Sequence, residues 1–132
     1  MIAQYWDETE DVLAQEIVSD WPAFLELVRR TETSSSGRGI PAIELSDDED
    51  VTCIFIRFEG GGCTVATGDS KGLAWPVEFN NGGCEYVHYD YFGSWSEVPA
   101  DLVIPREKAL AAVKSFLETG DISPSVLLLV RE

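Results

Sequence analysis

The side chains most capable of catalysis gather around the single histidine, His88. Cys84 lies four residues before it and Asp90 two residues after it, so a thiol, an imidazole and a carboxylate share one short segment. These groups can form a nucleophilic triad in which the imidazole activates the thiol. On one extended strand, however, Cys84 and His88 would lie roughly 13 Å apart, too far for proton transfer. The pattern favours an ordinary hydrogen-bonded histidine. The sequence leaves open whether Cys53 or Cys63 approaches His88 from a neighbouring strand and supplies the thiol instead.

Other residue patterns that often bind metals or phosphates are incomplete here. Three scattered cysteines and one histidine lack the paired spacing of structural zinc sites. The acidic run 47–50 lacks the alternating ligands and the central glycine of a calcium loop. The glycines at 60–62 lack the lysine and the strand-to-helix context of a phosphate loop. We therefore expect no catalytic residue, no metal and no cofactor.

Acidic residues outnumber basic residues by 24 to 9, which gives a formal net charge of −15 over 132 residues. No basic residue precedes Arg29, and the run Asp47, Asp48, Glu49 and Asp50 is uninterrupted. Such a chain repels nucleic-acid phosphates and anionic membrane surfaces, and it suits a basic protein partner. Negative charge also keeps a small protein soluble. Both explanations of the charge stand at this point.

The length of the chain predicts one domain, which we assign to residues 1–132. A hydrophobic content of 45% is enough for a folded core. The sequence has no apolar run of about 18 residues that would predict a membrane span. The N-terminal residues lack the charged and apolar regions of a signal peptide, and three unevenly spaced cysteines indicate free thiols. We expect a cytoplasmic protein.

Runs of β-branched and aromatic residues, separated by glycine-rich turns, predict a series of strands. The expected strands cover residues 2–7, 40–45, 51–58, 63–67, 73–79, 84–92 and 125–130. Residues 11–18 fit either a strand or a helical turn. The Asn-Asn-Gly-Gly segment at 80–83 predicts a hairpin between 73–79 and 84–92. The unbroken apolar run at 126–130 predicts a strand that is buried on both faces and central in the sheet.

Two segments have the periodicity of amphipathic helices. The first begins at Asp20, with either Ser19 or Asp20 as its cap, and is expected to have Arg29 and Arg30 in its last turn, before a loop at 33–39. Its apolar face consists of Trp21, Phe24, Leu25 and Val28. The second begins at Pro105 and ends at Gly120. Its apolar face consists of Ala109, Ala112, Val113, Phe116 and Leu117. The order of elements predicts an α+β fold, a single mainly antiparallel β-sheet with two helices packed on one face.

Aromatic and acidic residues cluster between positions 86 and 97, a composition typical of protein-binding surfaces. Together with the acidic run and one tryptophan beside a turn, they form the predicted contact set. Its members are Asp47, Asp48, Glu49, Asp50, Trp75, Tyr89, Asp90, Tyr91, Trp95 and Glu97. The alternative is that the aromatic rings of this set simply cover the open face of the sheet.

Two segments carry a resemblance to a known family. The first is Gly-Cys-Thr-Val-Ala-Thr-Gly-Asp-Ser-Lys-Gly-Leu at 62–73, and the second is the segment 104–120, which is followed by Pro124 and the last apolar run. They resemble the central strand pair and the C-terminal helix-and-strand unit of the Imm-one family. That family belongs to the immunity proteins of bacterial polymorphic-toxin systems. The resemblance covers roughly residues 40–130.

The resemblance implies a non-enzymatic antidote that binds and blocks a cognate toxin domain, often a nucleic-acid deaminase or nuclease. We expect a monomer that forms a 1:1 complex and has no direct contact with nucleic acid or membranes. An acidic, aromatic surface would suit the basic cleft of such a toxin. The alternative functions are an acidic adaptor or regulatory protein that binds another basic protein, and a small Cys/His enzyme.

Overall fold

The computed structural model describes residues 1–7, 12–34, 42–47, 51–57, 62–69, 72–76, 86–91, 94–99, 102–127 and 129–131. Its helices are α1 (Trp21–Ser34) and α2 (Arg106–Thr119). Its strands are β1 (Ile2–Asp7), β2 (Val12–Ile17), β3 (Ala42–Ser46), β4 (Thr52–Arg57), β5 (Cys63–Asp69), β6 (Gly72–Pro76), β7 (Tyr86–Tyr91), β8 (Ser94–Pro99) and β9 (Leu129–Arg131). The strand β2 resolves the choice left open by the sequence at 11–18.

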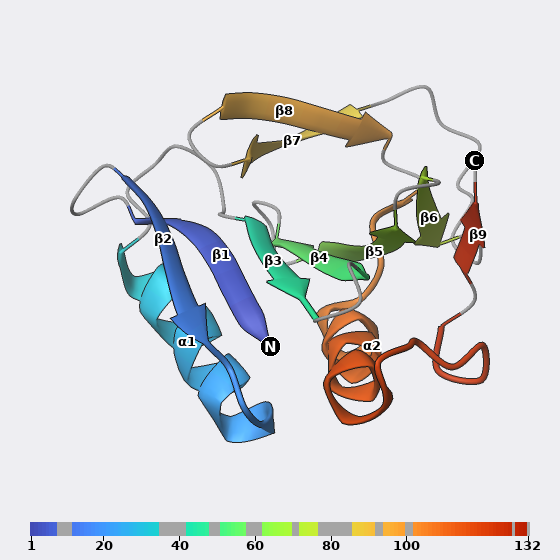
Figure 1. Ribbon diagram of the computed structural model, residues 1–132. Helices are drawn as coiled ribbons and strands as arrows, with labels where there is room; N and C mark the ends of the chain where they lie inside the picture. Colours follow the sequence, from blue (N-terminus) through green and yellow to red (C-terminus); the bar gives the residue numbers. More distant parts are fainter. Residues whose placement is uncertain are drawn as a thin grey trace.

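Seven strands form one sheet in the order β2-β1-β3-β4-β5-β6-β9, and every neighbouring pair is antiparallel. Helices α1 and α2 lie side by side on one face of this sheet (Figure 1). Among the described residues, strands β7 and β8 pair only with each other, and they lie over the opposite face, where β7 contacts β3 (Figure 1). The predicted α+β class, with a mainly antiparallel sheet and two helices on one face, is confirmed.

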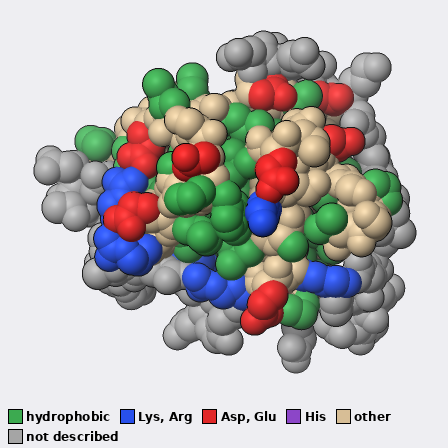
Figure 2. Space-filling model, turned by 90° about the horizontal axis from the view of Figure 1, so that it is seen from below, with side chains coloured by type: hydrophobic (Ala, Val, Ile, Leu, Met, Phe, Trp, Pro, Cys, Tyr) green, Lys and Arg blue, Asp and Glu red, His purple; other side chains and the backbone are tan. Residues whose placement is uncertain are grey.

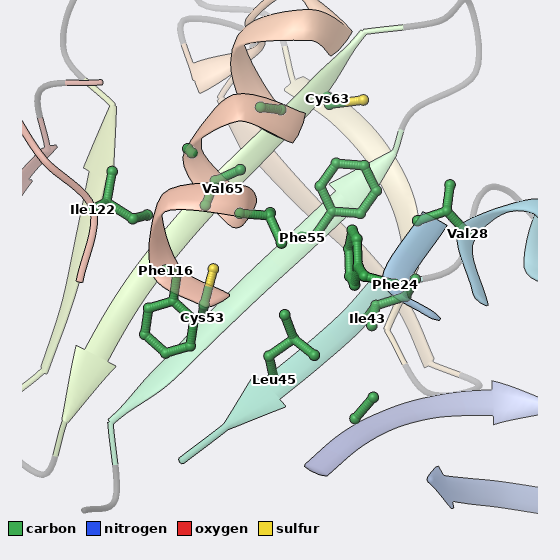
Figure 3. Packing of buried hydrophobic residues seen from close by; sticks show 14 of the residues in the cluster. Phe24, Val28, Ile43, Leu45, Cys53, Phe55, Cys63, Val65, Phe116 and Ile122 are labelled. Carbon is green, nitrogen blue, oxygen red and sulfur yellow. The ribbon is translucent and has the colours of Figure 1, made fainter. Parts of the chain in front are cut away.

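The main core lies between the sheet and the two helices (Figure 3). Phe24 of α1 meets Phe55 of β4 edge to face, with ring centroids 5.8 Å apart. Phe116 of α2 is fully buried in the same cluster. Side chains alternate between the two faces along a strand. Ile54 and Ile56, on either side of Phe55 in β4, therefore face away from the helices and form a second, smaller cluster with Ala42. The sheet is therefore covered on both faces near its centre.

Helix α1 starts as predicted, with the Asp20 carboxylate accepting a hydrogen bond from the Ala23 amide over 2.9 Å. Its buried residues are Phe24, Leu27, Val28 and Thr31, which again follow the i, i+3, i+4, i+7 pattern. The prediction that Leu25 belongs to this face is wrong, because its side chain is 40% exposed. The helix also continues to Ser34, so Arg29 and Arg30 do not lie in the last turn.

Helix α2 follows the sequence prediction closely. Pro105 immediately precedes it, and Ala109, Ala112, Val113 and Phe116 form its buried face. Gly120 ends the helix in the left-handed region at φ 81°, where its amide donates to the Phe116 carbonyl over 2.8 Å. A residue with a β-carbon would be strained in this conformation. In the part of the chain that the structure describes, neither helix is long and apolar enough to cross a membrane.

The predicted hairpin between 73–79 and 84–92 is wrong. Strand β6 pairs with β5 and β9, while β7 pairs with β8. The Asn-Asn-Gly-Gly segment at 80–83, on which the prediction depended, lies outside the described residues. Strand pairing is decided by contacts distant in sequence, and a local turn signal does not specify which strands become neighbours.

The prediction of a central strand at 125–130 is also wrong. Strand β9 has three residues and lies at the edge of the sheet, where β6 is its one partner among the described strands. The preceding residues form a turn in which the amides of Val126 and Leu127 both donate to the Ser123 carbonyl. Leu127 is 1% exposed and belongs to the core under the helices. Leu127 is therefore buried through a turn rather than through a strand covered on both faces.

Candidate functional site

The acidic run 47–50, called the acidic turn below, follows β3 directly, and two hydrogen bonds join Asp47 to Val51. The Asp47 amide donates to the Val51 carbonyl over 3.1 Å, and the Val51 amide donates to the Asp47 carboxylate over 3.1 Å. Asp47 is thus a structural member of the turn, with its carboxylate directed to the backbone. The other three predicted contact residues of the run, Asp48, Glu49 and Asp50, lie outside the described residues.

The register of the sheet places this turn beside exposed aliphatic side chains. Ser46, which precedes Asp47, pairs with Ile2 of β1, and Ile2 pairs with Ile17 of β2. Adjacent strands are about 4.8 Å apart, so Ile17 lies about 10 Å from Ser46 across the sheet. Ile2 is 48% exposed and Ile17 is 77% exposed. An aliphatic pair and the acidic turn therefore share one end of the sheet.

Sequence reasoning missed this aliphatic pair. In the structure, residues 13, 15 and 17 are more exposed than Ala14 and Glu16, which is the burial pattern of a strand with one face turned away from the core. The residue types do not alternate in the same way, because Gln15 stands between Leu13 and Ile17. The sequence therefore contained no clear signal for the exposed face.

Trp75, another predicted contact residue, lies in β6 and is only partly exposed. Its side chain packs against the smaller cluster of Ala42, Ile54 and Ile56 on the face opposite the helices. Trp75 covers the sheet and also leaves part of its surface at the boundary with solvent.

Five predicted contact residues lie in the β7–β8 ladder. Tyr89, Asp90 and Tyr91 belong to β7, and Trp95 and Glu97 belong to β8. In the backbone register, Asp90 is the cross-strand partner of Trp95. The ladder contacts β3, the strand that leads into the acidic turn. The structure thus brings half of the predicted set into one two-stranded element that adjoins β3.

Charge is distributed unevenly between the helices and the rest of the chain. The two helices contain five basic and four acidic residues. The remainder contains four basic and twenty acidic residues, so its formal charge is −16, against +1 for the helices. Ion pairs on the helix side join Arg29 to Glu26 and Lys114 to Glu118. Figure 2, seen from the helix side, shows Lys and Arg next to Asp and Glu over the described residues.

The two described cysteines do not form a catalytic site with the histidine. Cys53 and Cys63 are fully buried on the helix side of the sheet, whereas β7, which contains His88, lies over the other face. Burial raises the pKa of both thiols, that of Cys63 to about 11, so both stay protonated at neutral pH. Cys84 lies outside the described residues. Within the described ranges, no three His, Cys, Asp or Glu side chains are grouped closely enough to hold a metal ion.

A comparison with protein families gives a match that covers nearly the whole chain. The family is described as Immunity protein Imm1, and the match extends over residues 2–129. The chain belongs to this family of immunity proteins, as the segments 62–73 and 104–120 predicted. Immunity proteins act by binding a cognate bacterial toxin, and catalysis is not their function. A search of curated proteins gave no match.

Proposed function

We propose that this immunity protein neutralises a basic toxin that acts on nucleic acid, such as a deaminase or a nuclease. The observation that carries the proposal is the charge of −16 outside the helices against +1 within them. A toxin that binds nucleic acid needs a positively charged cleft. The strands and loops of the immunity protein present the complementary charge, whereas the helices do not.

The binding surface in this proposal consists of the acidic turn, the β7–β8 ladder and Trp75 of β6. Its charged residues are Asp47, Asp48, Glu49, Asp50, Asp90 and Glu97, and its aromatic residues are Trp75, Tyr89, Tyr91 and Trp95. Acidic groups would face lysine and arginine in the toxin cleft, and the aromatic rings would supply the apolar contact that anchors an interface. The immunity protein would act as a monomer in a 1:1 complex in the cytoplasm.

Electrostatic attraction suits the task of an antidote, because the toxin must be captured before it reaches its substrate. Complementary charge raises association rates by about 10- to 1000-fold at low ionic strength. The advantage falls as salt screens the charges, since the Debye length is about 8 Å at physiological ionic strength. Binding of the toxin domain should therefore weaken as salt rises.

The experiment is calorimetric titration of the toxin domain encoded by the adjacent gene, at two salt concentrations. We expect nanomolar or tighter binding that weakens at high salt. Asp90→Ala and Glu97→Ala should each weaken binding by about tenfold or more, because a carboxylate that faces a toxin cation is lost. The melting temperature of the free protein should stay unchanged in both variants.

Glu118→Ala provides the matched control. It also removes one carboxylate, but from the exposed side of α2, where Glu118 lies 3.9 Å from Lys114. Its toxin affinity should equal that of the wild type. Equal losses in all three variants would mean that only net charge matters, and unchanged affinity in both ladder variants would remove the proposed surface. Absence of wild-type binding at micromolar concentrations would favour an acidic adaptor for another basic protein.

A further inference from the structure

Strand β2 forms one edge of the sheet, and its ladder with β1 fixes the direction of its backbone groups. The Met1 amine donates to the Val18 carbonyl over 3.1 Å, and the Val18 amide donates to the Met1 carbonyl over 2.8 Å. Hydrogen-bonded and non-hydrogen-bonded pairs alternate along an antiparallel ladder. Residues 13, 15 and 17 therefore belong to non-hydrogen-bonded pairs with β1. Their amide and carbonyl groups point away from β1 toward the open edge.

The side chains of the same three residues share the face opposite α1. Glu16, one position away, contacts Tyr5 and forms an ion pair with Arg30 of α1, so the residues that alternate with it lie on the other face. Leu13 is 48% exposed, Ile17 is 77% exposed, and Gln15 is also exposed. The residues with outward backbone groups, Leu13, Gln15 and Ile17, therefore also expose their side chains, and those of Leu13 and Ile17 are aliphatic.

Strand β2 lacks several of the features that usually protect an exposed edge, and its one charged residue, Glu16, is paired with Arg30 of α1. Natural edge strands are kept short or contain lysine, proline or a bulge, because unpaired backbone groups bind other strands. The opposite edge follows this rule, since β9 has three residues. Strand β2 has six residues in regular register, Val-Leu-Ala-Gln-Glu-Ile, without proline or lysine. In the described part of the chain, no strand other than β1 pairs with it.

We propose that β2 receives an extended segment of the cognate toxin, which adds a strand to the sheet by backbone hydrogen bonding to Leu13, Gln15 and Ile17. Recognition by strand addition takes affinity from the main chain and specificity from the side chains that alternate along it. Leu13 and Ile17 would contact apolar side chains of the incoming segment. The inference rests on the proposed function and specifies a contact of the same partner.

Charge at the two ends of β2 indicates a basic segment rather than a second copy of this chain. The sequence that joins β1 to β2 contains Glu8, Glu10 and Asp11. At the other end, Ile17 is in line with Ile2 and Ser46, next to the acidic turn. Two copies with a net charge of −15 each would repel one another in this arrangement. A strand with lysine or arginine at its ends would be attracted at both.

Amide hydrogen exchange by NMR tests the backbone bonds directly in the wild-type protein. On addition of the toxin domain, exchange of the amides of Leu13, Gln15 and Ile17 should slow by about tenfold or more. The amides of Ala14 and Glu16 already donate to β1 in the register and provide internal controls. Unchanged exchange of all three edge amides in a formed complex would overturn strand addition and leave the proposed function intact.

The matched variants are Gln15→Pro and Gln15→Ala. Proline removes the outward amide without removing a bond to β1, and proline is tolerated on edge strands. Gln15→Pro should weaken toxin binding by about tenfold or more, and Gln15→Ala should leave it unchanged. If Gln15→Pro fails to fold, as circular dichroism would show, Ile17→Lys tests the apolar half of the contact. Full affinity in the folded Pro variant, or in Ile17→Lys, would contradict the proposal.

Two further outcomes separate the alternatives. Slow exchange of the edge amides in the free protein, lost on dilution, would assign β2 to a dimer of this chain and overturn the toxin as its occupant. Failure of the wild-type protein to bind the toxin domain would remove the proposed function and this inference together. Binding by the wild type with full affinity in every β2 variant would remove the inference alone.

Discussion

At the scale of single residues, two buried threonines differ in their hydrogen bonds. Thr31 of α1 is 4% exposed, and its hydroxyl donates to the Val28 carbonyl and accepts from the Arg57 guanidinium, both over 2.9 Å. Thr64 of β5 is fully buried, and its hydroxyl has no hydrogen-bond partner among the described residues. A buried hydroxyl without a partner costs stability, whereas a bond to a buried charge contributes to it.

The pair leads to opposite expectations for the same substitution. Thr64→Val should raise the free energy of unfolding by about 1 kcal/mol, because valine has the same shape and no polar group to satisfy. Thr31→Val should lower it by about 1–3 kcal/mol, because the buried Arg57 loses an acceptor. Urea unfolding of both variants measures the two changes. Destabilisation by Thr64→Val would show that this hydroxyl makes a bond in solution.

At the scale of elements, the start of α1 depends on one side chain. The Asp20 carboxylate accepts a hydrogen bond from the Ala23 amide, which has no partner within the helix. Asp20→Ala should lower the free energy of unfolding by about 1 kcal/mol. Ser19→Ala, one residue earlier, provides the control and should change it by less than about 0.5 kcal/mol. Equal effects of the two substitutions in urea unfolding would exclude this capping contribution.

The helices could be predicted from sequence because their signals are local. The cap at Asp20, the stripe around Phe116 and the left-handed Gly120 each depend on neighbours within a few residues. The 3.6-residue period alone did not choose between a stripe that includes Leu25 and one that includes Leu27, because both satisfy it. That choice is made by the sheet residues against which α1 packs.

Strand partners could not be predicted in the same way. The neighbours of β6 are β5 and β9, although β9 lies more than 50 residues later in the sequence. The apolar run at 126–130 indicated burial correctly for Leu127, but burial in a turn and burial in a central strand require the same residue types. The sequence could likewise name acidic and aromatic contact candidates, while the exposure of Ile17 follows only from what packs around β2.

At the scale of the whole molecule, the excess of acidic residues outside the helices should also act on stability. A net charge far from zero destabilises the compact state through self-repulsion. Raising the ionic strength from about 0.01 M to 1 M shortens the Debye length from about 30 Å to 3 Å and screens this repulsion.

We therefore expect the melting temperature to rise with sodium chloride. Relief of about 1 kcal/mol would correspond to roughly 4 °C for a domain of this size. A variant in which Asp48, Glu49 and Asp50 are replaced by their amides has three fewer negative charges, so its melting temperature should rise less with salt. Differential scanning calorimetry measures both proteins. A melting temperature that falls with salt would show that attractive ion pairs outweigh the repulsion.

The burial of Cys53 and Cys63 gives the molecule two internal reporters of transient opening. Both thiols are buried in the core on the two middle strands β4 and β5, and burial raises the pKa of each, so reagents that require a thiolate cannot modify them in the closed state. Modification must wait for fluctuations that expose β4 or β5. The rate at which an alkylating reagent labels each cysteine, read by peptide mass, would therefore measure how often β4 and β5 open, with and without a bound toxin.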